Sequence, residues 1–568
     1  MMNRGMEQIH GFLAARNMDI SCLGQYVEMN GCRQYHNLLC KFPGDQVLLE
    51  EEGQVSFLDG YVHNKKEMIT QIGGKDWMHA FADAMRRDPE QCLQKLRGGF
   101  CGYVYHDNES RLLAYTDQTS VKALYYYVEG ERWMVSDCLA YMTEVLRENA
   151  VKYDLNDTAV KYMMTYGYML DGSTFVRQIR RLLPGQIVSI AGGTADVRRY
   201  YTICDQEVKM SEKEAVEKVD AAFREAVRRE FEKDREYGYR HLVDLSGGLD
   251  SRMVCWVAHD LGYTDQLNVA YSKSGYLDDK ISRRIAGDLK HEYLFKPLDD
   301  LKWMYDLEQI IKKNNGAALY SGITGGARLL GMLNMEQFGI EHTGMIGDAV
   351  LSTFYHDKNF NYGKPRLGLH RYSERLAYEF EDTVMEGYSC QEMFAIYTRG
   401  ILGAQSSYRI RQHYVETASP FMDVDFLDTV FSIPFDYRNG HHLYLMWIKE
   451  KYPGAARYGW EKWGGVKPME SHIFLRKMKT TQRLLWQMVC NVMKIKNRDS
   501  MNPLDAWYLE DKEVQKFCES YYAEHIGQAV LSESIRKDIA VMFQQGNAAE
   551  KSMALTVLAA AELYFEQK

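Results

Sequence analysis

The sequence predicts an α/β protein with at least two differently built parts. The first 200 or so residues contain short strand-like runs separated by turns, whereas strand-like and helix-like segments alternate from about residue 205. The alternation predicts a largely parallel, doubly wound sheet with helices on both faces. A chain of 568 residues is also too long for one ordinary core. We therefore expect domains at 1–205 and 206–470, and a helical C-terminal extension at 471–568.

In the first part, alternating aromatic and aliphatic residues predict antiparallel strands. Examples are QVLLEEEGQVSFLDGYVHN, GGFCGYVYHDNESRLLAYTD and ALYYYVEGERWMVSD, in which Asp-Asn and Glu-Gly pairs are typical of turns. Helical segments are expected near 77–87 and 157–166. The passage at 178–201 predicts a hairpin.

In the second part, a charged helix is expected over 211–233. The strand-like runs HLVDL, LNVAY, HEYLF and IEHTGM follow, and helices are expected from Asp250 and Asp278 onward. From about residue 471 the pattern is helical, and the chain finishes in AAEKSMALTVLAAAELYFEQ. We interpret the Met and Leu stripe of this last segment as core.

The composition excludes several classes of protein. A net charge of -9 gives no global attraction to nucleic acid or anionic membranes. No apolar run approaches the ~20 residues of a membrane-spanning helix, and the start MMNRGMEQIHGFLAARN lacks a signal-peptide core. We therefore expect a cytoplasmic protein. The scattered cysteines form no CxxC pair, so free thiols are expected rather than disulfides or zinc, and His441 and His442 are interpreted as structural.

The turn SGGLDS (246–251) lies between HLVDL and the helix expected at Asp250. Two adjacent glycines let the backbone approach a bulky anion, and the start of a helix adds its positive end. The hydroxyls of Ser246 and Ser251 can donate to phosphate oxygens. An acid beside phosphate needs a cation between them, so Asp250 is a candidate Mg²⁺ ligand. The plainer alternative is a helix N-cap, which needs only Ser and one Gly; the Walker pattern GxxxxGK is absent.

This turn resembles the pyrophosphate loop of the asparagine synthetase family, which includes β-lactam synthetases and lasso-peptide cyclases. GYLDDKISRRIA (275–286) is similar to the segment after the family's second strand, with Asp278 at the position of its acid. TGMIGDAVLSTFY (343–355) resembles the second signature, SGEGxDExFGGY, with Asp348 at the metal-binding acid.

Two later segments also resemble this family. VETASPFMDVDFLDTVFSIP (415–434) is similar to ERxPFLD...LP, and EKWGGVKP (461–468) is similar to RxKxGxxxP. The second match implies that Lys462 is the catalytic lysine, with Lys467 as the alternative and a solvated surface lysine as the plain reading. Gly322–331 (GITGGARLLG) is interpreted as a helix start that lines the substrate pocket rather than as a nucleotide fingerprint.

The resemblance implies a synthetase domain of the adenine nucleotide α hydrolase type, with ATP and Mg²⁺ as cofactors. It implies that Asp250 and Asp348 hold the metal and that Lys462 stabilises charge on the α-phosphate and then on the tetrahedral oxyanion. The implied nucleotide-binding residues are Leu245, Ser246, Gly247, Gly248, Asp250, Ser251, Ala270, Asp278, Gly344 and Gly347. Arg252 stands where the family often has a second serine; it could reach phosphate or cap the surface.

Ligases of this family release pyrophosphate and make an acyl-adenylate, which an amine then opens. The implied partners are a small-molecule or peptide carboxylate and an amine or ammonia. A precursor peptide and a homodimer are compatible with the sequence, which fixes neither. Three uses stay open: asparagine synthesis from aspartate and ammonia, cyclisation or amidation of a specialised substrate, and silent nucleotide binding.

The first part resembles the family's glutamine amidotransferase half, which implies a class II, Ntn-hydrolase-like αββα domain. LRGGFCGYVYH is similar to LxGxFAFxxxD, YTDQTSVKALYYY to RDRxGxKPLYY, and IRRLLPGQ to IxxLPPG.

Three departures predict that this half does not hydrolyse glutamine. Position 2 is Met where the family exposes a cysteine, FPGD (42–45) replaces RGPD, and Asp59-Gly60-Tyr61 replaces NGE. In the synthetase half, Met345 stands where asparagine synthetases carry a glutamate, which predicts a less polar substrate pocket unless Glu341 fills that role.

Overall fold

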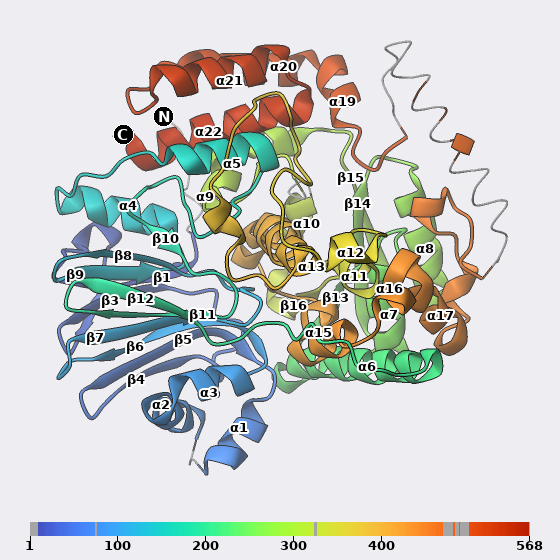
Figure 1. The fold of residues 1–568 in the computed structure, drawn as a ribbon, viewed down its shortest axis with the longest axis horizontal. Coiled ribbons are helices and arrows are strands. Elements are labelled where there is room, and N and C mark those ends of the chain that lie inside the picture. The colour runs from blue at the N-terminus through green and yellow to red at the C-terminus, as the bar shows by residue number, and fades with distance from the viewer. Residues whose placement is uncertain are drawn as a thin grey trace.

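The computed structural model describes residues 9–73, 76–322, 326–469 and 499–566, together with residues 481, 482, 485 and 488. Two domains lie side by side, and four C-terminal helices lie across one end of both (Figure 1). One domain is built on antiparallel sheets and the other on a parallel sheet, which confirms the predicted fold class. The predicted boundaries at 205 and 470 stay predictions, and Met2 lies outside the described residues.

The first domain contains two stacked antiparallel sheets. The first has the order β10-β8-β9-β1-β3-β2 and the second the order β12-β11-β7-β6-β5-β4. Their strands are β1 (Gly11–Arg16), β2 (Val27–Met29), β3 (Cys32–Asn37), β4 (Val47–Glu51), β5 (Gln54–Val62), β6 (Gly98–His106), β7 (Arg111–Thr116), β8 (Tyr125–Glu129), β9 (Arg132–Ser136), β10 (Arg180–Arg181), β11 (Gln186–Ala191) and β12 (Thr194–Arg199). The predicted hairpin is the β11–β12 pair.

Large aromatic side chains fill the space between these sheets. Phe12 of β1, Phe57 of β5 and Tyr103 of β6 are all buried there, and the rings of Phe12 and Phe57 lie 4.6 Å apart. Helices α1 (Lys65–Ile72), α2 (Trp77–Arg87) and α3 (Pro89–Lys95) cover one outer face, while α4 (Leu139–Glu148) and α5 (Asp157–Tyr166) lie toward the other (Figure 1). The result is an αββα domain, and the two predicted helices are α2 and α5.

The second domain contains one sheet of five parallel strands in the order β15-β14-β13-β16-β17. The strands are β13 (Arg240–Asp244), β14 (Gln266–Ser272), β15 (Glu292–Pro297), β16 (Phe338–His342) and β17 (Glu416–Ala418). The order reverses between β13 and β16, and a doubly wound sheet binds its ligands at the carboxyl ends of the strands at such a point. The two strand ends that flank this point lead into SGGLDS and TGMIGD.

Helices cover both faces of this sheet because neighbouring strand residues point to opposite sides. Val243 packs in the core with helices on one face, and Leu242 packs with Leu329 on the other. The first face carries α6 (Glu212–Tyr237), α7 (Asp250–Asp260), α8 (Leu277–Leu289), α15 (Val424–Phe431) and α17 (His442–Lys451). The other helices of this domain are α9 (Leu307–Asn314), α10 (Ala327–Leu330), α11 (Gly347–Leu351), α12 (Lys358–Asn361), α13 (Gln391–Ala395), the π-helix η6 (Ile396–Gln405), α14 (Ser406–Tyr408) and α16 (Phe435–Arg438).

The C-terminal helices are α19 (Leu504–Glu510), α20 (Lys512–His525), α21 (Glu533–Gln545) and α22 (Ala548–Phe565). Helix α22 contacts α5 of the first domain and α9 of the second. Its Met553, Leu555 and Leu558 are fully buried, which confirms that the stripe is core. Within the described part of the chain, no helix is long and apolar enough to cross a membrane.

Candidate functional site

The loop between β13 and α7 presents its backbone N–H groups to its own side chains. The N–H of Ser246 donates to Ser251 Oγ (2.9 Å), and the N–H of Gly248 donates to Ser246 Oγ (3.1 Å). The two hydroxyl oxygens lie 3.0 Å apart. The loop therefore forms a compact turn whose hydroxyl and N–H donors all lie at the carboxyl end of β13.

Close approach of neighbouring segments explains the glycines of this site. A Cβ atom at Gly247 would lie 3.1 Å from the Cβ of Glu461 and 3.2 Å from the Cα of Asp278. A Cβ atom at Gly344 would lie 2.3 Å from the backbone nitrogen of Ser251. Glycine is therefore required at Gly344, where the segment after β16 meets the loop, and is favoured at Gly247, where space is tight.

Asp250 and Asp348 come together at the point where the strand order reverses. A Cβ atom at Gly347, next to Asp348, would lie 2.7 Å from the carboxyl carbon of Asp250. The Tyr444 hydroxyl donates to Asp250 at 2.7 Å. Burial, followed by the neighbouring charge of Asp348, raises the pKa of Asp250 to about 8. Two acids in such a position fit a divalent cation with oxygen ligands.

Lys462 reaches the same place from the 3-10 helix Glu461–Trp463. Its Nζ lies 3.5 Å from Asp348 Oδ2 and 3.3 Å from His441 Nε2. The Lys462 side chain is 50% exposed, so it is available to a ligand. Lys467, the alternative, is also exposed, five residues further along the chain. His441 is a site residue that the sequence reasoning missed, since an adjacent histidine pair carries no signal for it.

Other predicted residues have different positions. Asp278 Oδ1 accepts the N–H of Gly247 (2.9 Å), while its Oδ2 is buried without a partner among the described residues. Burial raises the pKa of Asp278 to about 6. Ala270 is buried in β14, and Leu245 is buried at the end of β13. Residues 323–325 of the glycine-rich stretch lie outside the described residues, and α10 begins after them at Ala327.

One of the two alternatives for Arg252 was wrong. Arg252 is fully buried, so it does not cap the surface, and contact with phosphate stays a prediction. Its guanidinium donates to the carbonyl oxygens of Gly247 (3.1 Å), Ala455 (3.2 Å) and Tyr458 (3.3 Å). Arg252 therefore ties the SGGLDS turn to the segment that leads to Lys462.

Met345 is 8% exposed and packs in the apolar core of the second domain, together with Tyr397, Ile401 and Phe421. Its carbonyl oxygen accepts the Ser419 hydroxyl at 3.0 Å. The Met345 side chain is therefore part of an apolar cluster, and Met345 lies three residues before Asp348 in the chain.

Glu341, the alternative acid, is fully buried in β16, four residues before Met345. Both of its carboxylate oxygens accept hydrogen bonds from Arg411, whose Nη2 also lies 3.4 Å from Asp244. Glu341 is therefore engaged in a buried ion pair and is not available to a substrate.

A second cluster of metal-ligating residue types lies beneath the sheet. Asp234, His241 and His342 bring three ligand atoms together in the interior. Asp234 Oδ2 lies 2.8 Å from His342 Nε2 and 3.1 Å from His241 Nδ1, and Glu230 lies 3.2 Å from His342 Nδ1. These side chains already bond one another, so we interpret the cluster as a structural network between α6 and the sheet.

In the first domain, the counterparts of the glutaminase residues contact other parts of the protein. Asp45 forms ion pairs with Lys65 (2.6 Å) and with Lys233 of α6 (2.9 Å). Asp59 pairs with Lys122 (3.2 Å), and the Tyr61 hydroxyl donates to the carbonyl oxygen of Thr417 in β17 (2.8 Å). These segments hold the two domains together.

Comparisons with known proteins agree with both halves of this picture. Residues 44–201 match the glutamine amidotransferase domain family. The chain is 21% identical over 278 residues to asparagine synthetase (glutamine-hydrolyzing) 1 of Bacillus subtilis, covering 47% of this chain and 43% of that protein. It is 23% identical over 228 residues to a putative asparagine synthetase (glutamine-hydrolyzing) 2 of Methanocaldococcus jannaschii, covering 38% and 43%. Within residues 44–201 the chain matches the glutamine amidotransferase domain family, and over about half of its length it is similar to asparagine synthetases.

The match to these asparagine synthetases is partial, since it spans 43% of the length of each. Another relative, Amidase chyE of Penicillium rubens, is 24% identical over 175 residues, or 30% of this chain and 24% of that protein. A solved structure of B. subtilis glutamine phosphoribosylpyrophosphate amidotransferase with ADP and GMP covers 50% of this chain and 65% of its own. Its TM-score is 0.24 at 8% identity, which is too low to carry an argument.

Proposed function

We propose that this protein is an ATP-dependent amide ligase of the asparagine synthetase type. It would transfer AMP to a carboxylate, release pyrophosphate, and let an amine or ammonia open the resulting acyl-adenylate. The observation that carries the proposal is the meeting of the SGGLDS turn, the Asp250–Asp348 pair and Lys462 at one strand edge. Its asparagine synthetase relatives support the ligase class and the use of ATP.

The residues of the turn can take up phosphate oxygens. The Ser246 and Ser251 hydroxyls and the N–H of Gly248 now bond within the turn. Such short local bonds can be exchanged for bonds to a leaving pyrophosphate, and the start of α7 adds a favourable dipole. We therefore assign pyrophosphate binding to residues 246–251, with Arg252 as the residue that fixes the turn from below.

Asp250 and Asp348 are the proposed holders of Mg²⁺. When bound, the ion would supply positive charge to the phosphates of ATP. Asp250 is oriented by the Tyr444 hydroxyl, which donates to its Oδ1. Asp348 is half exposed and has the Lys462 ammonium 3.5 Å away.

Lys462 would stabilise negative charge that develops first on the α-phosphate and later on the tetrahedral oxyanion. Its ammonium is held by Asp348 and His441, and it lies 5.8 Å from the centre of the Trp460 ring. A preorganised donor of this kind contributes roughly 3 kcal/mol, or about a hundredfold in rate.

The test is carboxylate-dependent exchange of labelled pyrophosphate into ATP, with a panel of amino acids, peptides and other carboxylic acids. We expect at least one acid to support exchange, and AMP to be the nucleotide product once an amine is added. Formation of ADP and phosphate would contradict the proposal. Nucleotide binding without exchange for any acid would support a silent nucleotide-binding protein instead.

We further propose that the acyl donor is larger or less polar than aspartate where it meets Met345. A thioether cannot pair with an ammonium group, and the apolar surroundings of Met345 offer no replacement. The ion pair of Glu341 with Arg411 supports this choice over the alternative in which Glu341 takes the role of the missing glutamate. The test is aspartate-dependent AMP formation with ammonia, with a bona fide asparagine synthetase alongside. Comparable kcat/KM values would restore plain ammonia-dependent asparagine synthesis.

Cyclisation or amidation of a specialised substrate, as in lasso-peptide cyclases and β-lactam synthetases, is the use that this pocket favours. A precursor peptide as substrate, a homodimer and a cytoplasmic location remain predictions from the sequence.

A further inference from the structure

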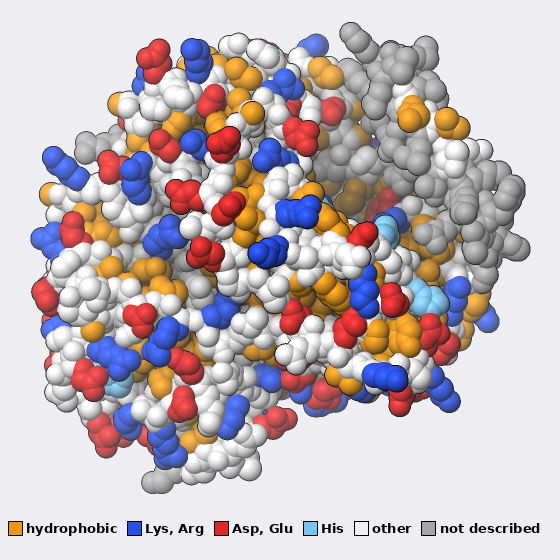
Figure 2. All heavy atoms as spheres, viewed as in Figure 1, with side chains coloured by type: hydrophobic (Ala, Val, Ile, Leu, Met, Phe, Trp, Pro, Cys, Tyr) orange, Lys and Arg blue, Asp and Glu red, His pale blue; other side chains and the backbone are white. Residues whose placement is uncertain are grey.

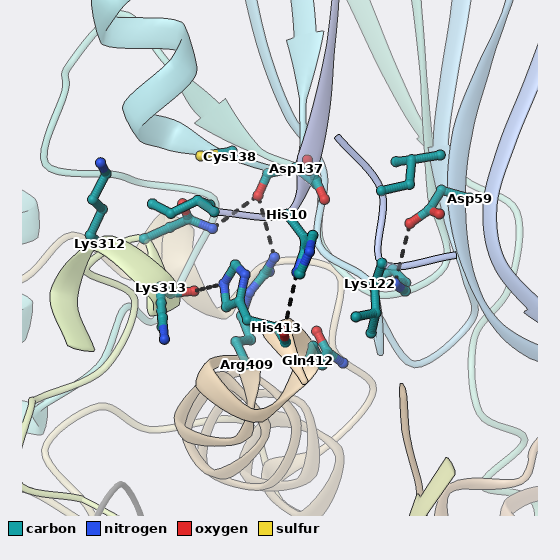
Figure 3. Close-up of a pocket in the computed structure, with 15 residues that line it drawn as sticks. His10, Asp59, Lys122, Asp137, Cys138, Lys312, Lys313, Arg409, Gln412 and His413 are labelled. Atoms are coloured by element: carbon teal, nitrogen blue, oxygen red, sulfur yellow. Dashed lines mark hydrogen bonds and ion pairs between the residues drawn. The ribbon is translucent and has the colours of Figure 1, made fainter. Parts of the chain in front are cut away.

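A small cavity of about 30 Å³ lies between the two domains, away from the strand edge of the proposed ligase site. Figure 3 shows His10 and Asp137 of the first domain on one side and Arg409 and His413 of the second on the other. Arg409 and His413 belong to the 3-10 helix Arg409–His413, and His10 directly precedes β1. A cavity of this size has room for about two water molecules or one very small ion.

Arg409 is the unusual member of this cavity. Its side chain is 7% exposed, yet Nε and Nη1 have no hydrogen-bond partner within the described part of the chain. Nη2 makes one long bond of 3.4 Å, to the carbonyl oxygen of Asp137. The guanidinium carbon lies 5.8 Å from the centre of the Tyr125 ring, which gives only part of the missing stabilisation.

Two other buried arginines show what is missing at Arg409. Arg411 pairs with Glu341, and Arg438 pairs with Glu392 at 2.8 Å. No ion pair joins Arg409 to an acid among the described residues, although it lies in the same helix as Arg411. A buried guanidinium is expected to have either an anionic partner or several carbonyl acceptors, as Arg252 has, because an unsatisfied buried charge is costly.

The acids around the cavity do not supply that partner. Asp59 is engaged by Lys122, which lies 2.8 Å from Glu416 as well. Asp137 Oδ1 accepts the N–H of Phe12 at 2.8 Å. Burial, followed by the charge of Asp59, raises the pKa of Asp137 to about 7. None of these carboxylates forms an ion pair with Arg409 among the described residues.

His413 adds a second unsatisfied group to the same cavity. Its Nε2 lies 3.1 Å from the carbonyl oxygen of Lys313, so Nε2 carries the proton and Nδ1 is left as an acceptor. Nδ1 is buried and has no partner among the described residues. Burial lowers the pKa of His413 to about 3, which keeps the ring neutral. A ligand that satisfies both groups must accept from Arg409 and donate to His413.

We propose that this interdomain cavity binds a small carboxylate-type monoanion, of the size of formate or hydrogencarbonate, between Arg409 and His413. The anion accepts hydrogen bonds from the guanidinium, and its own O–H or a companion water donates to His413 Nδ1. The volume excludes tetrahedral dianions such as sulfate, and the nearby Asp59 and Asp137 disfavour a double charge. Because the cavity is lined from both domains, the bound anion fastens one domain to the other.

The test uses the full chain and ¹³C-formate, whose NMR signal broadens when the ion binds. We expect saturable broadening that unlabelled hydrogencarbonate reverses and sulfate does not. Arg409→Gln should weaken formate binding by about tenfold or more, since it removes the guanidinium that the ion is proposed to contact. Arg132→Gln, at an exposed position of β9, is the matched control and should bind formate like the wild type.

Absence of saturable broadening in the wild type would overturn the proposal and leave water as the occupant. Unchanged binding in Arg409→Gln would also overturn it, because the ion would then lie elsewhere. If Arg409→Gln fails to fold, the competition between formate, hydrogencarbonate and sulfate on the wild type still decides the matter. None of these measurements depends on ligase activity.

Discussion

Two sets of segments resemble signatures of one family: the loops after β13 and β16 in the second domain, and the segments of Asp45, Asp59 and Tyr61 in the first. Their side chains differ in the partners that they bond. In the second domain, the Ser246 and Ser251 hydroxyls form their hydrogen bonds within their own turn, as far as the described residues show, and Lys462 remains half exposed. In the first domain, Asp59 is buried against Lys122, which also pairs with Glu416 of the other domain, and the Tyr61 hydroxyl donates to Thr417 of that domain. The loop of the second domain can exchange its internal hydrogen bonds for bonds to a ligand. The residues of the first domain cannot do so without separating the two domains.

We infer from this difference that the first domain has kept its fold while its polar groups have acquired structural partners, and we predict that it has lost its chemistry. Lys122 shows how this is done. Its ammonium pairs with two carboxylates, at 3.2 Å from Asp59 Oδ2 of the first domain and at 2.8 Å from Glu416 Oε1 of the second. In the described part of the chain it is the only cation that pairs with both. We therefore expect substitutions in the second domain's site to change catalysis, and substitutions around Lys122 to change stability.

The largest effect is expected from the two acids. Asp250→Asn or Asp348→Asn should abolish Mg²⁺-dependent pyrophosphate release, because each removes a charged oxygen ligand of the ion. Asp436→Asn, at a side chain that is 75% exposed, is the control and should retain activity. The measurement is pyrophosphate release with an accepted carboxylate, and wild-type release by Asp250→Asn would show that the metal site is assigned to the wrong residues.

The next effect concerns the lysine. Lys462→Ala should leave ATP binding nearly intact and lower turnover about a hundredfold, because it removes a donor used in the transition state. Calorimetric ATP binding and steady-state kinetics separate the two effects. Lys467→Ala should behave like the wild type, and loss of turnover in Lys467→Ala alone would move the catalytic role to that residue.

On the side of the first domain, Lys122→Met should lower the free energy of unfolding by about 3–5 kcal/mol, since it leaves two buried carboxylates without a cation. Lys66→Met, at a lysine side chain that is 82% exposed, should change it little. Denaturant unfolding followed by fluorescence measures both. A triple variant with Asp59→Asn and Glu416→Gln should recover part of the loss, and no difference between Lys122→Met and Lys66→Met would refute the interdomain role.

A smaller effect is expected from pH. Burial lowers the pKa of His36 to about 4, from 6.5. Between those values the unfolded chain binds a proton that the folded chain does not, so stability should fall as pH falls from about 6.5 toward 4, by at most about 1.4 kcal/mol per pH unit for one histidine. Denaturant unfolding at several pH values measures this slope. His36→Gln should reduce it, and an unchanged slope in that variant would argue against His36 as a contributor.

The last prediction is that the protein does not hydrolyse glutamine. Glutamine with ATP should yield no glutamate above background, because Asp45, Asp59 and Tyr61 are engaged elsewhere and position 2 is Met. Coupled glutamate detection, with a glutamine-hydrolysing asparagine synthetase as positive control, measures it. Glutamate release that a thiol-directed glutamine analogue blocks would break the comparison between the two domains.

The amino-acid sequence by itself determined the order of strands and helices, the α/β class and the SGGLDS turn at the end of β13. Those features depend on short-range periodicity and on glycine, so they can be recognised locally. It also placed Asp348 and Lys462 in recognisable segments. Their proximity, across 114 residues of chain, follows from the strand order of the sheet.

Only the tertiary structure decided what surrounds those residues. It placed His441 beside Lys462, buried Arg252 beneath the turn, engaged Glu341 with Arg411, and left Arg409 without an acid in a cavity between the domains. The sequence gives the charge of an arginine, but the partner of that charge depends on which distant segments the fold brings next to it. Burial and pairing depend on those distant segments, and for that reason a local pattern cannot predict them.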